Sequence, residues 1–349
     1  MTLSSSDRTA ELWIEQLRSG EPLGPEDAAA LAEALTENRL SLPVGGEILT
    51  LLARRGESEE ELYAFAKHLR ERAVPFTAPG SGTAVDLCGS GGATLRTFNV
   101  STVSAFVVAA SGLPVAKHGN ASARGPCGSS DLLEALGLPV KASRAFAEES
   151  FRQEGLAFLH APLFHPILAS VGPLRRSLGT RTIFNLLGPL VNPAGVRTQV
   201  VGCFDEGYAE RVAHVLPRLG VESLLSASGA GGADELSPHG GSRGFRLSSG
   251  RTEPFQVEAE TLLLPKEREG DWLALPPAES ALVARELLQG APGARRGAVL
   301  LTAGAALWIG GRATDLPTGV RRAREVLDSG AALAKLEALQ ALAQGRCWS

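Results

Sequence analysis

Glycines, hydroxyl groups and a lysine gather in one stretch of this chain, between residues 86 and 137. The first turn there, Gly89-Ser90-Gly91-Gly92, directly follows the apolar run 84–87, which is predicted to be a strand. Glycines allow a sharp turn and let backbone N–H groups come close to an anion. Such a turn is also a common connection between a strand and a helix, so the side chains that follow decide what it binds.

Those side chains favour phosphate. The segment 99–102, Asn-Val-Ser-Thr, can cap the apolar segment 103–110, which is predicted to be a helix with its N-terminus facing the glycine turn. The residues 115–116 are interpreted as the end of a second strand that delivers Lys117 and His118 at its tip. A fixed cation then faces the anion, and the pattern predicts a polyphosphate site.

Two common nucleotide-binding motifs are absent from this stretch. The turn lacks the Gly-Lys-Ser/Thr ending of a P-loop, and its glycines do not follow the G-x-G-x-x-G order of a dinucleotide site. Further along, Asp234 and Glu235 follow a glycine-rich segment, 229–233. Such a pair can hold Mg²⁺ together with substrate phosphates, although a solvated acidic loop is the alternative.

Composition indicates an ordinary globular protein of 349 residues with 44% hydrophobic residues and a net charge of −4. The polar first residues lack the apolar core of a signal peptide and no segment is apolar enough to span a membrane, so a cytoplasmic location is expected. The absence of a basic run disfavours a nucleic-acid surface. The cysteines have neither zinc-site nor disulfide-framework spacing, and a catalytic thiol is disfavoured because no motif supplies a base; they are Cys88, Cys127, Cys203 and Cys347.

The elements around these motifs divide into a helical front and an α/β body. Helical spacing marks 12–17, 25–35 and 59–72, and Ser58 with Glu61 forms a capping-box pattern. One apolar stripe of the third helix is interpreted as packing, either within the helical domain or against a second subunit; it comprises Leu62, Phe65, Ala66 and Leu69.

After a linker rich in proline and glycine, 75–82, strands and helices alternate. The segments 198–204, 208–219 and 223–228 are predicted to form strand, helix and strand, the unit of a largely parallel sheet. The segment 165–190 is again predicted to be helical.

Four blocks in the glycine-rich stretch resemble the signature of the anthranilate phosphoribosyltransferase family, whose usual form is G-T-G-G-D-G, T-F-N-I-S-T, V-A-K-H-G-N and G-S-A-D. They occur here in that order and at matching spacing. The likeness covers most of the chain and is most specific at 181–193; its further blocks are 158–162, 165–166, 171–176 and 234–237.

The resemblance implies a fold and a reaction. The fold is a small helical domain, 1–78 joined by the helical segment 165–190, and an α/β domain, 79–349, with a mainly parallel central sheet like that of nucleoside phosphorylases. The site would lie in the cleft between them. The reaction transfers 5-phosphoribosyl from phosphoribosyl pyrophosphate (PRPP) to anthranilate, in tryptophan biosynthesis, through an oxocarbenium-like state that needs positioning and charge stabilisation. A homodimer is the family expectation.

The resemblance also assigns residues. His118, Asn120 and Arg175 are carried over as the catalytic group, with Arg175 facing the anthranilate carboxylate and His118 positioning rather than acting as a base. Gly89 and Pro189 complete the anthranilate site, and Mg²⁺ is assigned to Ser101, Asp234 and Glu235. The PRPP positions are Gly89, Gly91, Gly92, Thr97, Asn99, Ser101, Thr102, Lys117, Ser129 and Ser130.

Two positions depart from the family pattern. Ala93 stands where an aspartate is usual, and Ala121 where an arginine is usual, while Arg96 or Arg124 could partly compensate for the lost cation. The changes permit an active enzyme of a variant subgroup, a transferase for another aromatic acceptor, or a member without catalysis. A nucleoside phosphorylase and a homologue that binds nucleic acid remain the alternatives; the intact loop and negative charge disfavour the latter.

Overall fold

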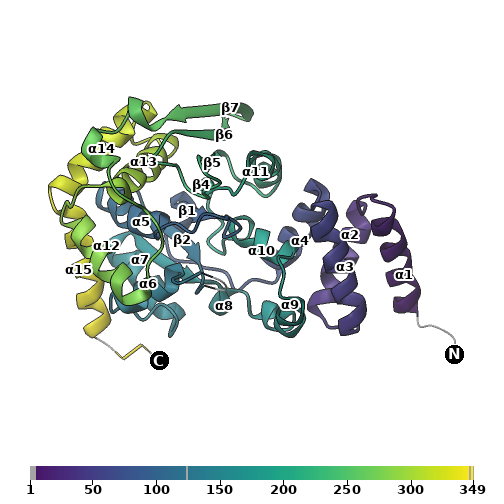
Figure 1. Cartoon of the computed structure of the whole chain (residues 1–349). Coiled ribbons are helices and arrows are strands. Elements are labelled where there is room, and N and C mark those ends of the chain that lie inside the picture. Colours follow the sequence, from purple (N-terminus) through teal and green to yellow (C-terminus); the bar gives the residue numbers. More distant parts are fainter. Residues whose placement is uncertain (1–4, 123–124, 346, 349) are drawn as a thin grey trace.

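A computed structural model of the chain describes residues 5–122, 125–345 and 347–348. Four helices come first and lie together at one end of the molecule (Figure 1). They are α1 (Ser5–Arg18), α2 (Pro25–Thr36), α3 (Leu42–Arg55) and α4 (Glu59–Glu71). Pro25 lies in the first turn of α2, and the predicted capping box is present at the start of α4, where Ser58 accepts from the backbone N–H of Glu61. The sequence did not single out α3.

A seven-stranded sheet forms the centre of the remaining chain. Its first five strands are parallel and its last two are antiparallel to their neighbours. In spatial order they are β3 (Leu156–His160), β2 (Val115–Gly119), β1 (Val85–Gly89), β4 (Thr198–Gly202), β5 (Ser223–Gly229), β6 (Gly241–Ser248) and β7 (Arg251–Glu258). This mostly parallel sheet, with an N-terminal helical domain beside it, confirms the predicted fold class. The predicted strand–helix–strand unit is β4, α11 and β5.

Helices cover both faces of the sheet. One face carries the C-terminal helices, and α11 lies on the opposite side, toward the N-terminal helices (Figure 1). The helices are α5 (Val100–Ala110), α6 (Ser129–Ala135), α7 (Arg144–Glu154), α11 (Glu206–Arg218), α12 (Pro277–Leu288), α13 (Ala294–Ile309), α14 (Leu316–Asp328) and α15 (Ala331–Gln344). Within the described residues, no helix is both long enough and apolar enough to cross a bilayer.

The segment predicted to be helical, 165–190, is broken into short pieces. Pro166, Pro173 and Pro189 each lie in the first turn of a new piece, because proline starts a helix well but removes a hydrogen bond inside one. The remaining α-helices of the described residues are α8 (Ala161–Phe164), α9 (Gly172–Leu178) and α10 (Ile183–Leu186), and the 3₁₀ turns are η1 (Ser81–Thr83), η2 (Pro166–Ala169), η3 (Gly188–Leu190), η4 (Ala259–Thr261) and η5 (Pro265–Glu267).

One hydrophobic core joins the N-terminal helices to the sheet. It contains residues of α1–α4, of α9 and α10, of α11 and of the strands β1, β4 and β5. The predicted stripe on α4 lies inside this core, where all four side chains are at most 1% exposed, so it packs within the chain and not against a second subunit. Helix α9 contacts α3. The division at residues 78 and 79, with the 165–190 segment joining the first part, stays a proposal.

Candidate active site

A cavity of about 350 Å³ opens at the carboxyl ends of β1 and β2. Ligands of parallel sheets usually bind at this edge, because loops and helix N-termini converge there. The loops after β1 and β2 form its walls, together with the α9–η3 segment and the residues 234–235. It brings together most of the sequence-predicted site residues, namely Gly89, Gly91, Thr97, Asn99, Ser101, Thr102, Lys117, His118, Asn120, Ser129, Arg175, Asp234 and Glu235.

Three predicted residues do not line the cavity. Gly92 packs toward Phe204, which a Cβ at this position would approach to 2.8 Å. Ser130 is buried, and its hydroxyl lies 2.9 Å from Nδ1 of His160. Pro189 is buried as well, and its carbonyl accepts a hydrogen bond from Gln199. Their direct contact with a ligand is therefore not supported by this geometry.

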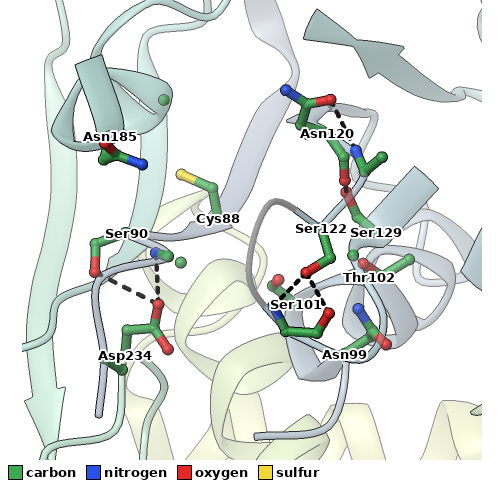
Figure 2. A pocket seen from close by; sticks show the side chains of 18 of the residues that line it. Cys88, Ser90, Asn99, Ser101, Thr102, Asn120, Ser122, Ser129, Asn185 and Asp234 are labelled. Carbon is green, nitrogen blue, oxygen red and sulfur yellow. Dashed lines mark hydrogen bonds between the residues drawn. The ribbon is translucent and has the colours of Figure 1, made fainter. Parts of the chain in front are cut away.

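The acidic pair is held against the two phosphate-binding elements that the sequence predicted. Asp234 Oδ2 accepts a 2.7 Å hydrogen bond from the backbone N–H of Gly91, whose φ of +66° suits glycine. Ser90 Oγ lies 3.4 Å from the same oxygen (Figure 2). Glu235 Oε1 accepts from the backbone N–H of Ser101 in the first turn of α5. Hydrogen bonds to these two carboxylates thus join the 234–235 segment to the glycine turn and to the N-terminus of α5.

Close backbone packing places this acidic pair. A Cβ on Gly202, at the end of β4, would overlap the backbone carbonyl of Asp234, so the loop that carries the pair can cross the strand only over a glycine. Burial raises the pKa of Glu235 to about 8, and the neighbouring charge of Asp234 adds to the shift. Burial also raises the pKa of Asp234. Because burial disfavours the charged form of both carboxyl groups, a cation between them would stabilise the two ionised carboxylates.

Lys117 does not stand at the tip of a strand, as the sequence predicted. Strand β2 begins at Val115, and its backbone pairs with β3 as far as Gly119, so Lys117 lies at its middle and is 4% exposed. Its Nζ donates a 2.7 Å hydrogen bond to the carbonyl of Leu87 in β1. The ammonium reaches the cavity from within the sheet, where its position is fixed.

Two buried histidines lie edge to face, with their ring centres 5.2 Å apart. His118 Nδ1 is 3.0 Å from the Gly188 carbonyl, and His165 Nε2 is 2.8 Å from the Val191 carbonyl. Since a carbonyl only accepts, each of these nitrogens carries the proton. Burial lowers the pKa of both rings to about 4. At neutral pH His118 therefore presents an unprotonated Nε2, which has no partner among the described residues.

The loop after β2 is organised by its own side chains. Asn120 Oδ1 accepts from the Ala121 N–H, and Ser129 Oγ donates to the Asn120 carbonyl (Figure 2). Asp131 accepts from the N–H groups of both Ser122 and Gly128. Arg124, a possible compensating cation, lies outside the described residues. Asn99 is the N-cap residue of α5, but its side chain donates to the Cys127 carbonyl instead of capping the helix.

The helical segment supplies the remaining wall. Arg175 comes from α9, and Phe184 and Asn185 come from α10. Asn185 and Ser90 were not predicted as site residues; the first lies within the specific block 181–193 and the second within the glycine turn, which were the available signals. Cys88 also lines the cavity. Burial raises the pKa of its thiol well above the ordinary value, which disfavours a nucleophilic role.

This arrangement suits a substrate with several phosphates and a carboxylate. Backbone N–H groups, a buried ammonium and hydroxyls can bind phosphates, and a separate arginine can bind a carboxylate. The two carboxylates are too few to hold a metal alone, and no cluster of three or more metal-ligating side chains occurs in the described part of the chain. They fit Mg²⁺, which typically takes one or two carboxylates and completes its shell with substrate phosphates and water.

Comparisons with known proteins agree with this geometry. Residues 81–333 match the model of the glycosyl transferase family a/b domain, and residues 12–73 match that of the family's helical bundle domain. The anthranilate phosphoribosyltransferase of Shouchella clausii is 39% identical over 93% of this chain and 96% of its own. That of Pelotomaculum thermopropionicum is 40% identical over 93% of this chain and 94% of its own.

Solved structures of similar proteins have the same fold. The anthranilate phosphoribosyltransferase of Thermus thermophilus superposes with a TM-score of 0.86 at 37% identity, covering 95% of this chain and 99% of that one. The Saccharomyces cerevisiae structure, described as a complex with PRPP and Mg, has a TM-score of 0.84 at 24% identity, covering 98% of this chain and 99% of that one.

Proposed function

The chain belongs to the anthranilate phosphoribosyltransferase family, and from that premise we propose that it transfers 5-phosphoribosyl from PRPP to anthranilate. Its class is thus that of a pentosyltransferase. One observation carries the choice of substrates: a single cavity joins a glycine turn, a helix N-terminus and a buried lysine to a separate arginine on α9. The first group suits a diphosphate, and the arginine suits the carboxylate of an aromatic acid.

The reaction exchanges one bond at the anomeric carbon of the ribose. The bond to the pyrophosphate oxygen breaks and a bond to the anthranilate nitrogen forms. The amine loses one proton, which passes to the leaving diphosphate or to water. Lys117 stabilises the leaving diphosphate. The N–H groups of Gly91 and Ser101, which donate to Asp234 and Glu235 in this structure, would add to this stabilisation when these carboxylates bind a cation instead. Arg175 holds the acceptor, and the unprotonated Nε2 of His118 accepts a hydrogen bond that orients the amine. This role is positioning, because a pKa of about 4 makes His118 a weak base.

We assign Mg²⁺ to Asp234 and Glu235, with Ser101 beside them. When bound, the ion neutralises charge on the leaving diphosphate. A relative of this fold is described as a complex with PRPP and Mg, which supports the assignment. The product would enter tryptophan biosynthesis in the cytoplasm, and the enzyme would act as a homodimer. The pathway and the homodimer rest on the family resemblance, and the cytoplasmic location rests on the composition of the sequence.

Ala93 and Ala121 leave the acceptor open, because both line the cavity and both are smaller than the residues usual in the family. A related transferase with another aromatic acceptor is therefore the second candidate.

The direct test follows the loss of anthranilate fluorescence when purified protein is mixed with PRPP and Mg²⁺. Turnover supports the proposal. Binding of PRPP without anthranilate turnover would favour another aromatic acceptor, which a panel of aminobenzoates would identify. Phosphate-dependent cleavage of thymidine or uridine, without transfer to anthranilate, would instead establish a nucleoside phosphorylase.

A further inference from the structure

Arg96 stands in the loop between β1 and α5, and its backbone is fixed from outside that loop. Its carbonyl accepts a 3.0 Å hydrogen bond from the N–H of Ala274, and the N–H of Phe98 donates a 2.8 Å bond to the carbonyl of Trp272. These bonds form a short antiparallel contact with the 272–274 segment. The arginine therefore projects from an anchored backbone.

The side chain of Arg96 comes close to the loop after β2. Its Nη1 lies 3.7 Å from the point where a Cβ on Gly125 would stand. Gly125 is itself held by Ser122, whose hydroxyl donates to the Gly125 carbonyl at 2.8 Å and accepts from the Gly125 N–H at 2.7 Å. All three residues line the cavity. The guanidinium thus lies between the two loops that carry the phosphate-binding groups.

The described residues that line the cavity include three cations. Lys117 is buried and already donates to a backbone carbonyl. Arg175 belongs to α9, in the part of the cavity formed by the helical segment. Arg96 is an exposed residue, and within the described part of the chain its guanidinium forms no hydrogen bond or salt bridge, so its donors remain available to a ligand. Its charge also acts on Asp234, where it favours the ionised carboxylate.

Ala121, on the facing loop, offers a methyl group at the position where the family motif carries an arginine. We infer that Arg96 binds the diphosphate of PRPP and provides, from the β1–α5 loop, the positive charge that the β2–α6 loop of this chain does not carry at residue 121. The inference rests on the proposed function. Arg96 is not among the PRPP-binding positions that the family resemblance assigns to this chain.

Calorimetric titration tests this role with three probes: Mg²⁺–PRPP, Mg²⁺–pyrophosphate and ribose 5-phosphate. Arg96→Ala and Arg96→Gln are expected to raise the Kd for PRPP and for pyrophosphate about 10- to 100-fold, the value of a lost charged hydrogen bond. Ribose 5-phosphate binding is expected to stay unchanged. Arg96→Lys should retain most of the affinity. Arg251→Ala, in the distant β6–β7 hairpin, removes the same charge and is the matched control.

A charge-relocation variant sharpens the test. Adding Ala121→Arg to Arg96→Ala should restore PRPP affinity to within about threefold of the unsubstituted chain, because the charge returns from the facing loop. Thermal unfolding of every variant separates loss of binding from loss of folding. If folded Arg96→Ala binds PRPP as tightly as the unsubstituted protein, this inference is overturned and the proposed function is not. The same holds if the substitution weakens only the binding of ribose 5-phosphate, or if the double variant does not regain PRPP affinity. An unsubstituted protein that fails to bind PRPP would overturn the proposed function as well.

Discussion

Asp234 accepts a hydrogen bond from the backbone N–H of Gly91 across 143 positions of sequence, at 2.7 Å. One N–H cannot donate fully both to this carboxylate and to a phosphate. A cation that draws the Asp234 carboxylate toward itself would free the Gly91 N–H for the substrate, so metal and phosphate binding should assist each other.

Asp234→Asn should reduce kcat/KM for PRPP about 100-fold, because the neutral amide is a poorer Mg²⁺ ligand and leaves diphosphate charge unneutralised. A Mg²⁺ titration of the initial rate at fixed PRPP measures the effect. Glu253→Gln, on the exposed edge strand β7, is the control. Unaltered Mg²⁺ dependence in Asp234→Asn would remove this residue from the metal site.

Arg175→Ala should raise KM for anthranilate about 10- to 100-fold and change KM for PRPP little, since a carboxylate loses its guanidinium partner. The neighbouring Arg176 is exposed, does not line the cavity and belongs to the same helix, so Arg176→Ala is a closely matched control. Steady-state kinetics with each substrate varied in turn gives both constants. An equal effect of the two substitutions would count against a specific role for Arg175.

Ser129 and Ser130 should behave differently although they are adjacent. Ser129→Ala is expected to weaken PRPP binding several-fold, about the loss of one neutral hydrogen bond, because Ser129 lines the cavity. Ser130→Ala should leave PRPP affinity unchanged and lower the free energy of unfolding, since it leaves His160 without its buried partner. Calorimetry of PRPP binding and urea unfolding of both variants distinguish the two roles. If Ser130→Ala weakened PRPP binding and Ser129→Ala lowered only the stability, the loop would be placed differently in solution.

Protonation of His118 and His165 should oppose folding in acid. His118 and His165 have pKa values of about 4 in the folded chain, below the ordinary value of 6.5. At these two sites the unfolded chain binds more protons between these limits, so their contribution to stability falls as pH falls through that window. From about pH 7.5 to about pH 5.5, each histidine should cost about 1.4 kcal/mol. Glu235, whose pKa is raised to about 8, acts in the opposite direction, so the test is a comparison between two chains. Urea unfolding at both pH values should show that His165→Gln loses about 1.4 kcal/mol less on acidification than the unsubstituted chain. The same pH dependence in both chains would contradict the assignment.

Local sequence patterns predicted much of the fold correctly. The capping box at Ser58 and the first-turn proline at Pro25 are both present, because such signals act within a few residues. The fragmentation of 165–190 was not predicted, although the prolines within this segment are helix breakers that mark where its pieces begin.

The site was predicted less completely, because its details depend on tertiary contacts. The sequence placed Lys117 at a strand tip, whereas pairing of β2 with β3 extends the strand past it. Adjacent Ser129 and Ser130 have the same side chain, yet helix geometry turns one toward the cavity and the other toward His160. The position of Arg96 near the facing loop likewise depends on backbone hydrogen bonds to the 272–274 segment, which lies far away in the sequence.

The shared core has a consequence for how the chain is made. The ribosome releases α1–α4 first, but their apolar faces pack on α9, α10 and α11, which follow more than a hundred residues later. Until then the early helices must either expose these faces or be shielded by a chaperone. Fragment 1–78, although it contains four complete helices, is therefore expected to aggregate or remain loosely packed when synthesised alone, and truncations of this protein should spare the region up to α11.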